Sequence, residues 1–158
     1  MKIRKALMSD LSAILSVYET ARAFMRESGN PNQWRDRDPD PDVVEGDIAD
    51  GNLYVIWDEE GIQGVFAFIP YEDYGAIDGA WLSDDPSCAV HRVASAGKKR
   101  GILNAVMDYA FSRVQNIKID THHDNAVMQH QLEKYGFRKC GVIYLENGEP
   151  RLAYQMIR

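Results

Sequence analysis

The sequence predicts an α/β chain of the α+β type, with a mixed, mostly antiparallel sheet, a central parallel pair of strands and about four flanking helices. The first observation is two β-hairpins, expected over residues 53–69 and 137–157. The second is a strand–helix–strand unit over residues 88–121, whose two strands are expected to run parallel. The third is that no repeat, linker or low-complexity segment divides the chain, so we expect a single domain over residues 1–158.

The N-terminal part is expected to hold a short strand and two helices. The strand covers residues 2–7, and Ser9 is the expected N-cap of the first helix. That helix ends near the Gly-Asn-Pro sequence at residues 29–31. The second helix has Asp40 as its cap and Pro41 at its first position. Apolar residues of the first helix recur at helical spacing: Leu11, Ile14, Leu15, Tyr18, Ala21 and Met25.

The rest of the chain alternates strands with helices. A Glu-Glu-Gly turn at residues 59–61 joins the strands of the first hairpin, and Asn147-Gly148 is a strong turn signal in the last one. Gly136 is suited to end the last helix. Residues 71–85 are expected to form a loop. The remaining expected elements are strands over residues 53–57, 63–69, 88–94, 117–121, 137–145 and 151–157, and helices over residues 100–114 and 124–135.

Composition and charge argue against several classes of function. A net charge of −6 and a pI near 5.2 argue against nucleic acid as the main partner. No apolar run approaches the roughly 20 residues of a membrane span, and no signal-peptide pattern follows the basic N-terminus. We therefore expect a cytoplasmic protein without a membrane partner. Cys88 and Cys140 are expected to be buried free thiols, with Cys140 as an acyl-accepting nucleophile as the alternative.

A basic loop that contains glycine follows the strand over residues 88–94 and opens the next helix. Its sequence is Gly-Lys-Lys-Arg-Gly over residues 97–101. Three cations at a helix N-terminus oppose the helix dipole, so they are unfavourable there by themselves. An anion that accepts the unpaired N–H groups of the first turn would make the arrangement favourable. The loop is therefore expected to bind a phosphate or pyrophosphate, with a tight, solvated surface connection as the alternative.

Together with a second segment, this loop resembles the GNAT superfamily of N-acetyltransferases. In that segment Asn125 lies just after a strand, and Gly136-Phe137 opens the next strand one helix later. The order of elements looks like the GNAT fold over essentially the whole chain. The resemblance implies that the two parallel strands splay apart and that acetyl-coenzyme A binds at their gap. It also implies a set of residues that bind this co-substrate: Val93, Ala94, Lys98, Lys99, Arg100, Gly101, Ile102, Leu103 and Asn125.

Three positions bear on how far the resemblance extends. Lys98 stands where the family usually has Gln or Arg, and Leu103 stands where a second Gly or Ala is usual. Leu103 either narrows the approach of the pyrophosphate or faces the core. Leu132 stands where many family members place a tyrosine that acts as the general acid. For Asn125, a role as a helix cap is as good an interpretation as a contact with the pantetheine arm.

The resemblance implies that an amine attacks the thioester directly, which requires groups that accept and donate protons. His91, expected on the opposite face of its strand from Arg92, is one catalytic candidate, with a buried structural role as its alternative. His122 is a second candidate, and shaping its loop is its alternative. Tyr135 is a further candidate for the acid. No metal site is expected, because nothing distant in sequence completes a ligand shell around His122 and His123.

Residues that could bind the acceptor come from three separate segments. They are Trp34 between the first two helices, Tyr71 and Glu72 after a strand, and Tyr144 in the last hairpin. The expected function is transfer of an acetyl group to the primary amine of a small molecule or a peptide. A non-catalytic acyl-coenzyme A sensor is the alternative from another class, and a phosphate-binding protein unrelated to acyl transfer is a third. The exposed strands of the last hairpin favour a homodimer.

Overall fold

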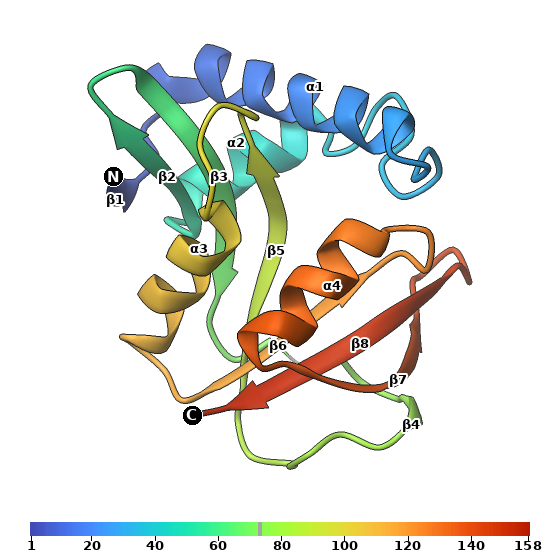
Figure 1. The fold of residues 1–158 in the computed structure, drawn as a ribbon. Coiled ribbons are helices and arrows are strands. Elements are labelled where there is room, and N and C mark those ends of the chain that lie inside the picture. The colour runs from blue at the N-terminus through green and yellow to red at the C-terminus, as the bar shows by residue number, and fades with distance from the viewer. Residues whose placement is uncertain (73) are drawn as a thin grey trace.

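The computed structural model describes residues 1–72 and 74–158 and contains one eight-stranded sheet (Figure 1). The strand order is β1-β2-β3-β5-β6-β8-β7-β4, and the β5–β6 pair is parallel while the other pairs are antiparallel. The mixed, mostly antiparallel sheet with four helices is therefore confirmed. The strands are β1 (Lys2–Lys5), β2 (Leu53–Asp58), β3 (Gly61–Ile69), β4 (Asp78–Gly79), β5 (Cys88–Ser95), β6 (Asn116–Thr121), β7 (Arg138–Tyr144) and β8 (Pro150–Ile157).

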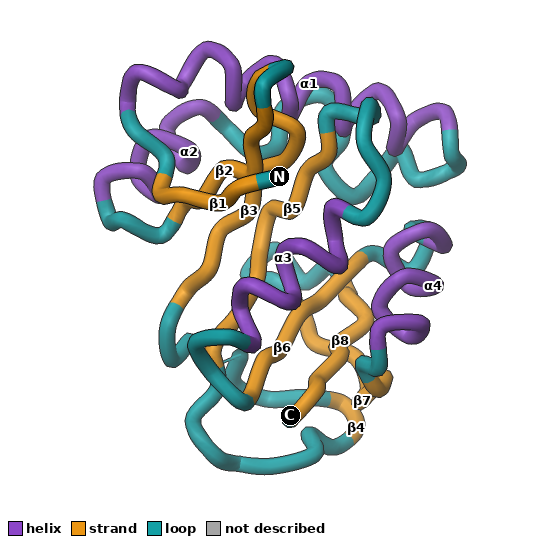
Figure 2. The backbone as a smooth tube through the Cα atoms, turned by 60° about the vertical axis from the view of Figure 1, so that its left-hand side comes forward, coloured by secondary structure: helices purple, strands orange, loops and turns teal. Residues whose placement is uncertain are grey.

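Two helices pack on each face of this sheet. The helices α1 (Leu11–Glu27) and α2 (Pro41–Ala49) pack against one face, which we call the α1/α2 face. The helices α3 (Ile102–Phe111) and α4 (Ala126–Tyr135) cover the other, the α3/α4 face, which is turned toward the viewer in Figure 1. Figure 2 shows α1 and α2 gathered around the N-terminal strands and α4 beside the C-terminal ones. Within the described residues, no helix is long and apolar enough to cross a membrane.

The two central strands separate soon after they begin. β5 and β6 pair in parallel at only two positions, Cys88 with Ile117 and Ala89 with Lys118. Beyond these pairs β5 follows β3, whereas β6 follows β8, so that the two strands diverge (Figure 1). The expected splay of the parallel pair is therefore confirmed. It opens a gap in the middle of the sheet between strands that each keep their other partner.

Two local features differ from the sequence-based predictions. Ser9 is not the N-cap of α1, because it lies in a short 3-10 helix, η1 (Met8–Asp10), that precedes α1. Asp10 occupies the N-cap position of α1 without a side-chain cap hydrogen bond, and its Oδ2 instead accepts a hydrogen bond of 2.8 Å from the Leu7 backbone N–H at the start of η1. The hydrogen bond from Arg4 lowers the pKa of the Asp10 carboxyl, which keeps this anchor ionised. Residues 71–85 also include the two-residue strand β4, which is too short to leave a periodic pattern in the sequence.

The start of α3 lies directly over β3 because Gly64 has no side chain. A Cβ atom built at position 64 would lie 2.9 Å from Cγ2 of Ile102, the first residue of α3, and 3.4 Å from the carbonyl oxygen of Ala94. Ile102 is itself buried. The close approach therefore sets the height of the N-terminus of α3 above the sheet.

We expect Gly64→Ala to destabilise the fold by about 1–3 kcal/mol, because the added methyl group overpacks the contact with Ile102. Gly46→Ala is the matched control. Gly46 lies exposed within α2, and a Cβ atom there meets nothing within 4 Å, so this variant should be stabilised by about 0.5–1 kcal/mol. Chemical denaturation of both variants measures these changes, and equal stabilities would contradict the proposed packing.

Candidate functional site

A cavity of about 460 Å³ lies where β5 and β6 separate. This volume is typical of a site for a small ligand. The α3/α4 face contributes mainly apolar groups to its lining: Val90, Val93, Ile119, Met128 and Asn125. The α1/α2 face and the loop between α1 and α2 contribute the titratable groups: Asp38, Asp40, Glu72, His91, Arg92, Asp120 and Arg151. The cavity is therefore lined by residues from both faces of the sheet, with a different chemical character on each.

A β-bulge shapes β5 at the edge of this cavity. In the register with β3, His91 pairs with Ala67 and Ala94 pairs with Val65, so β5 holds one extra residue between these pairs. Arg92 has a φ of 51°, a left-handed conformation that non-glycine residues seldom adopt. The bulge interrupts the alternation of side chains along β5. Because of the extra residue, two successive side chains, those of His91 and Arg92, can point to the same face of the sheet.

Two contacts from the α1/α2 face hold the bulge in place. The Tyr18 hydroxyl of α1 donates a 2.9 Å hydrogen bond to the Arg92 carbonyl oxygen. The Arg92 guanidinium binds both carboxylate oxygens of Asp47 in α2, at 2.7 and 2.9 Å. The prediction that His91 and Arg92 point to opposite faces is therefore wrong. Arg92 reaches α2, and His91 points away from the α3/α4 face into which the preceding Val90 packs.

His91, Glu72 and Asp120 form a compact polar group on the α1/α2 side of the cavity. His91 Nε2 is hydrogen-bonded to Glu72 Oε2, and His91 Nδ1 lies 3.6 Å from Asp120 Oδ1. The hydrogen bond with His91 lowers the pKa of the Glu72 carboxyl below its ordinary value. The Tyr74 hydroxyl donates a 2.9 Å hydrogen bond to Asp120 Oδ1, and burial raises the pKa of Tyr74 well above its ordinary value. A neutral phenol therefore holds one carboxylate beside the imidazole.

The N-terminus of α3 has backbone N–H groups that no side chain caps. Gly101 occupies the N-cap position with a φ of 77°, and no side-chain hydrogen bond caps the helix. Ile102 and Leu103 are both buried in the core on the α3/α4 face. Leu103 therefore faces the core and does not narrow the approach to these N–H groups. A pyrophosphate group fits this helix end, because anions accept hydrogen bonds from uncapped N–H groups.

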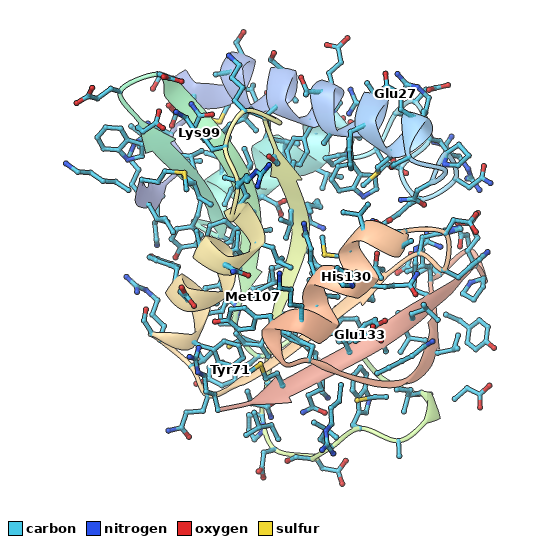
Figure 3. All side chains as sticks on the ribbon, viewed as in Figure 1. Glu27, Tyr71, Lys99, Met107, His130 and Glu133 are labelled. Carbon is cyan, nitrogen blue, oxygen red and sulfur yellow. The ribbon has the colours of Figure 1, made fainter. Side chains whose placement is uncertain are left out.

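The three cations of the basic loop differ in their surroundings. Lys98 and Arg100 are exposed, and no ion pair joins either of them to the described residues. Lys99 points instead toward the β2–β3 hairpin, where its Nζ lies 3.2 Å from Glu60 and 3.7 Å from Asp58 (Figure 3). Two of the three expected cations are therefore available to an anion at the start of α3.

Asn125 lines the cavity and also caps α4. Its Oδ1 accepts a 3.0 Å hydrogen bond from the Met128 backbone N–H, and its Nδ2 donates at 2.9 Å to Gln33 Oε1. The helix-cap interpretation of Asn125 is therefore confirmed, and its amide group also links α4 to the loop between α1 and α2. Val93 lines the cavity, whereas Ala94 is buried in the core on the α1/α2 face.

Several other candidate residues lie outside the cavity. His122 is buried, its Nδ1 accepts a 3.0 Å hydrogen bond from the Asp124 N–H, and burial lowers its pKa. It therefore shapes the loop before α4. Tyr71 is 73% exposed and Tyr144 is 59% exposed, and neither belongs to the described residues that line the cavity. Ligand atoms of His122, His123 and Asp124 come within 4.8 Å of one another, but all three belong to one short loop.

The positions considered for a general acid and for a nucleophile lie elsewhere. Leu132 is fully buried in the core. The Tyr135 hydroxyl donates a 2.7 Å hydrogen bond to Asp108 in α3, and Tyr135 is not among the described residues that line the cavity. Cys88 is buried as expected. Cys140 is partly exposed, and burial of its thiol raises its pKa, which argues against a nucleophile.

Sequence reasoning placed Glu72, His91, Trp34 and Val93 near a site, and the structure brings them together around one cavity. It missed Asp120 as a partner of His91. A signal was present, because Asp120 lies near the C-terminal end of the strand that runs parallel to the His91 strand. Arg151, Tyr18 and Asp47 were also missed, since their contacts join segments far apart in the chain.

Comparisons with known proteins agree with this geometry. No family model matches the chain, and no curated protein matches it. An acetyltransferase of the GNAT family from Streptococcus agalactiae is 30% identical, with a TM-score of 0.89 over 99% of this chain and 95% of that one. A ribosomal-protein-alanine N-acetyltransferase from Brucella melitensis is 22% identical, with a TM-score of 0.65 over the full length of both chains. yncA of Salmonella typhimurium, solved with its cofactor acetyl-CoA, is 15% identical, with a TM-score of 0.64 over 99% of this chain and 92% of that one.

The last two similarities concern the fold alone, whereas the first combines sequence identity with nearly complete coverage of both chains. The chain belongs to the GNAT family of acetyltransferases.

Proposed function

We propose that this protein transfers an acetyl group from acetyl-coenzyme A to the primary amine of a small molecule or a peptide. The observation that carries the proposal is the convergence of His91, Glu72 and Asp120 at the gap between β5 and β6. A group that accepts a proton from an amine is needed there, because an ammonium nitrogen has no lone pair for attack.

The α3/α4 face suits the co-substrate. The uncapped N-terminus of α3, with Lys98 and Arg100 beside it, would bind the pyrophosphate, and the α3/α4 side of the gap would accept the pantetheine arm along β5. Acetyl-coenzyme A supplies an activated thioester: a bond forms between the amine nitrogen and the acetyl carbon, the carbon–sulfur bond breaks, and the thiol and one proton are released. The opposite face is left for the acceptor.

His91 is suited to accept the proton of the ammonium group. When its Nε2–H donates to Glu72, Nδ1 is left as the acceptor atom. A proton taken up at Nδ1 would lie beside Asp120, so both neighbouring carboxylates stabilise the imidazolium that forms. Tyr74 keeps Asp120 in position through its hydrogen bond. Glu72 and Asp120 therefore act on the amine through His91.

The charges on the acceptor side favour a cationic amine. Asp38, Asp40, Glu72 and Asp120 all line the cavity. Arg92 also lines it, but both of its hydrogen bonds to Asp47 are short, so its charge is neutralised within the fold. The excess of carboxylates raises the local concentration of an ammonium group before it is deprotonated.

A non-catalytic acyl-coenzyme A sensor is the second candidate function. The observation in its favour is Leu132, whose fully buried side chain leaves that position of α4 without a proton donor. A sensor would bind coenzyme A in the same way but would have no need for the polar group around His91. The two functions therefore differ in turnover and not in coenzyme A binding.

We expect coenzyme A to raise the melting temperature by about 5–10 °C at 100 times its dissociation constant. Gly101→Glu should abolish this shift, because a carboxylate at the N-terminus of α3 would occupy the place of the pyrophosphate. Gly148→Glu is the matched control: Gly148 also has a positive φ, of 86°, and open space around its Cβ, but it lies in the β7–β8 turn. Thermal unfolding with and without coenzyme A distinguishes the two variants. If coenzyme A still raises the melting temperature of Gly101→Glu, the pyrophosphate does not bind at the N-terminus of α3.

Release of free thiol from acetyl-coenzyme A should depend on the presence of an amine. A panel of primary amines, including amino acids, polyamines and short peptides, should contain acceptors that raise the rate well above hydrolysis. The measurement is a thiol assay with mass spectrometry of the acetylated product. If coenzyme A binds but the whole panel remains unreactive, the sensor is favoured over the enzyme.

His91→Gln should lower the rate at saturating amine by about 10²–10⁴-fold, because it removes the proton acceptor. The lowered pKa of Glu72 keeps this carboxylate ionised at neutral pH, so that it remains a hydrogen-bond partner of the imidazole. The coenzyme A shift should remain in His91→Gln, because the His91 side chain lies on the acceptor side of the cavity. An unchanged rate at saturating amine in this variant would exclude the role of His91.

A further inference from the structure

The acceptor side of the cavity contains an arginine whose charge is only weakly compensated by the protein. Arg151 in β8 lines the cavity, yet the residue is only 6% exposed. A buried guanidinium is costly unless anions and hydrogen-bond acceptors replace its water. The anions and hydrogen-bond acceptors around Arg151 therefore determine how well its charge is compensated.

The contacts of Arg151 with the described residues involve two of its three guanidinium nitrogens, Nη1 and Nη2. Nη1 donates at 2.9 Å to the Pro150 carbonyl oxygen, whereas Nη2 makes two long contacts of 3.4 Å, with Glu149 Oε2 and the Gln33 carbonyl oxygen. The other carboxylate oxygen of Glu149 is bound by Arg35. A guanidinium has five N–H donors, and a carboxylate satisfies two of them in parallel.

The register of the sheet places this cation next to the polar group around His91. Asp120 in β6 pairs with Ala153 in β8, and Arg151 lies two residues before Ala153, on the same face of the sheet. Such diagonal neighbours have β-carbons about 7–8 Å apart. Arg151 lies beyond the Thr121–Leu152 pair, on the side where β5 and β6 have diverged. The cavity thus holds an anionic centre at Asp120 and a cationic centre at Arg151, and the distance between them suits a small molecule that carries both charges.

We propose that Arg151 binds a carboxylate of the acceptor, so that the acceptor is an amino acid whose amine faces His91. The inference rests on the proposed acetyl transfer and narrows its substrate class. Side chains of Met25, Trp34, Val43 and Leu145 line the same cavity and provide apolar surface for the carbon skeleton. An acceptor with both charges is bound in one orientation, because exchanging its ends would bring like charges together at both centres.

A purely structural role for Arg151 makes a different prediction. Its contact with the Gln33 carbonyl oxygen joins β8 to the loop between α1 and α2, so loss of the guanidinium alone would loosen this loop. In that case all amines would be affected equally. Selection of a carboxylate by Arg151 would instead affect only acceptors that carry one.

The test uses free L-amino acids, their carboxamides and the corresponding decarboxylated amines as acceptors with the full-length protein. We expect wild-type kcat/KM to be at least about 30-fold higher for an acid than for its carboxamide. In Arg151→Met this ratio should fall close to one, mainly through a higher KM for the acid, and Arg151→Lys should restore part of it. Arg35→Met is the matched control, because Arg35 shares the Glu149 partner but does not line the cavity, and it should keep the ratio.

The outcomes separate this inference from the proposed function. Equal rates for acids, carboxamides and decarboxylated amines in the wild type would overturn the carboxylate site while leaving acetyl transfer intact. A folded Arg151→Met that retains the preference for acids would also overturn it. If Arg151→Met does not fold, the kcat/KM values of the wild type and of Arg151→Lys for acids, carboxamides and decarboxylated amines still test the carboxylate site. If no amine is acetylated although coenzyme A binds, the proposed function fails first and the acceptor site fails with it.

Discussion

The site depends on the separation of β5 from β6, and the bulge at Arg92 is the feature that maintains it. An extended β5 could continue its parallel pairing with β6 and close the sheet. The bulge changes the course of β5, and its left-handed residue is held from one side by Tyr18 and Asp47. The strain of that backbone conformation is of order 1–3 kcal/mol and is offset by these buried contacts. Helices α1 and α2 therefore support the site as well as the core.

The gap in the sheet divides the chemistry of the molecule between its two faces. The α3/α4 face offers helix N–H groups and apolar walls, which suit a long ligand with a charged end. The α1/α2 face, with the loop between α1 and α2, gathers titratable groups from five separate segments of the chain. The described residues that line the cavity come from both faces of the sheet where β5 and β6 separate, so a donor and an acceptor could meet there. The bulge brings His91 to this junction.

The sequence was sufficient for the architecture because hairpin turns, helix caps and periodicity are local signals. The caps at Asp40 and Gly136 and the basic loop before α3 follow from neighbouring residues. The site was predicted only in part, since Glu72 and His91 were named but not their contact. The roles of Asp47 and Arg151 depend on partners many residues away. A bulge is equally hard to foresee, because one inserted residue leaves no pattern of its own.

The polarity of the cavity follows from which charges the fold neutralises and which it leaves to a ligand. Asp47 compensates Arg92, and the acids of the β2–β3 hairpin compensate Lys99, so these ion pairs are part of the scaffold. Glu72 and Asp120 share a single imidazole, His91, which is positive only when protonated. Proton uptake by His91 therefore relieves the repulsion between two carboxylates. The same arrangement that attracts an ammonium group thus also favours taking its proton, and one cluster can serve binding and deprotonation in turn.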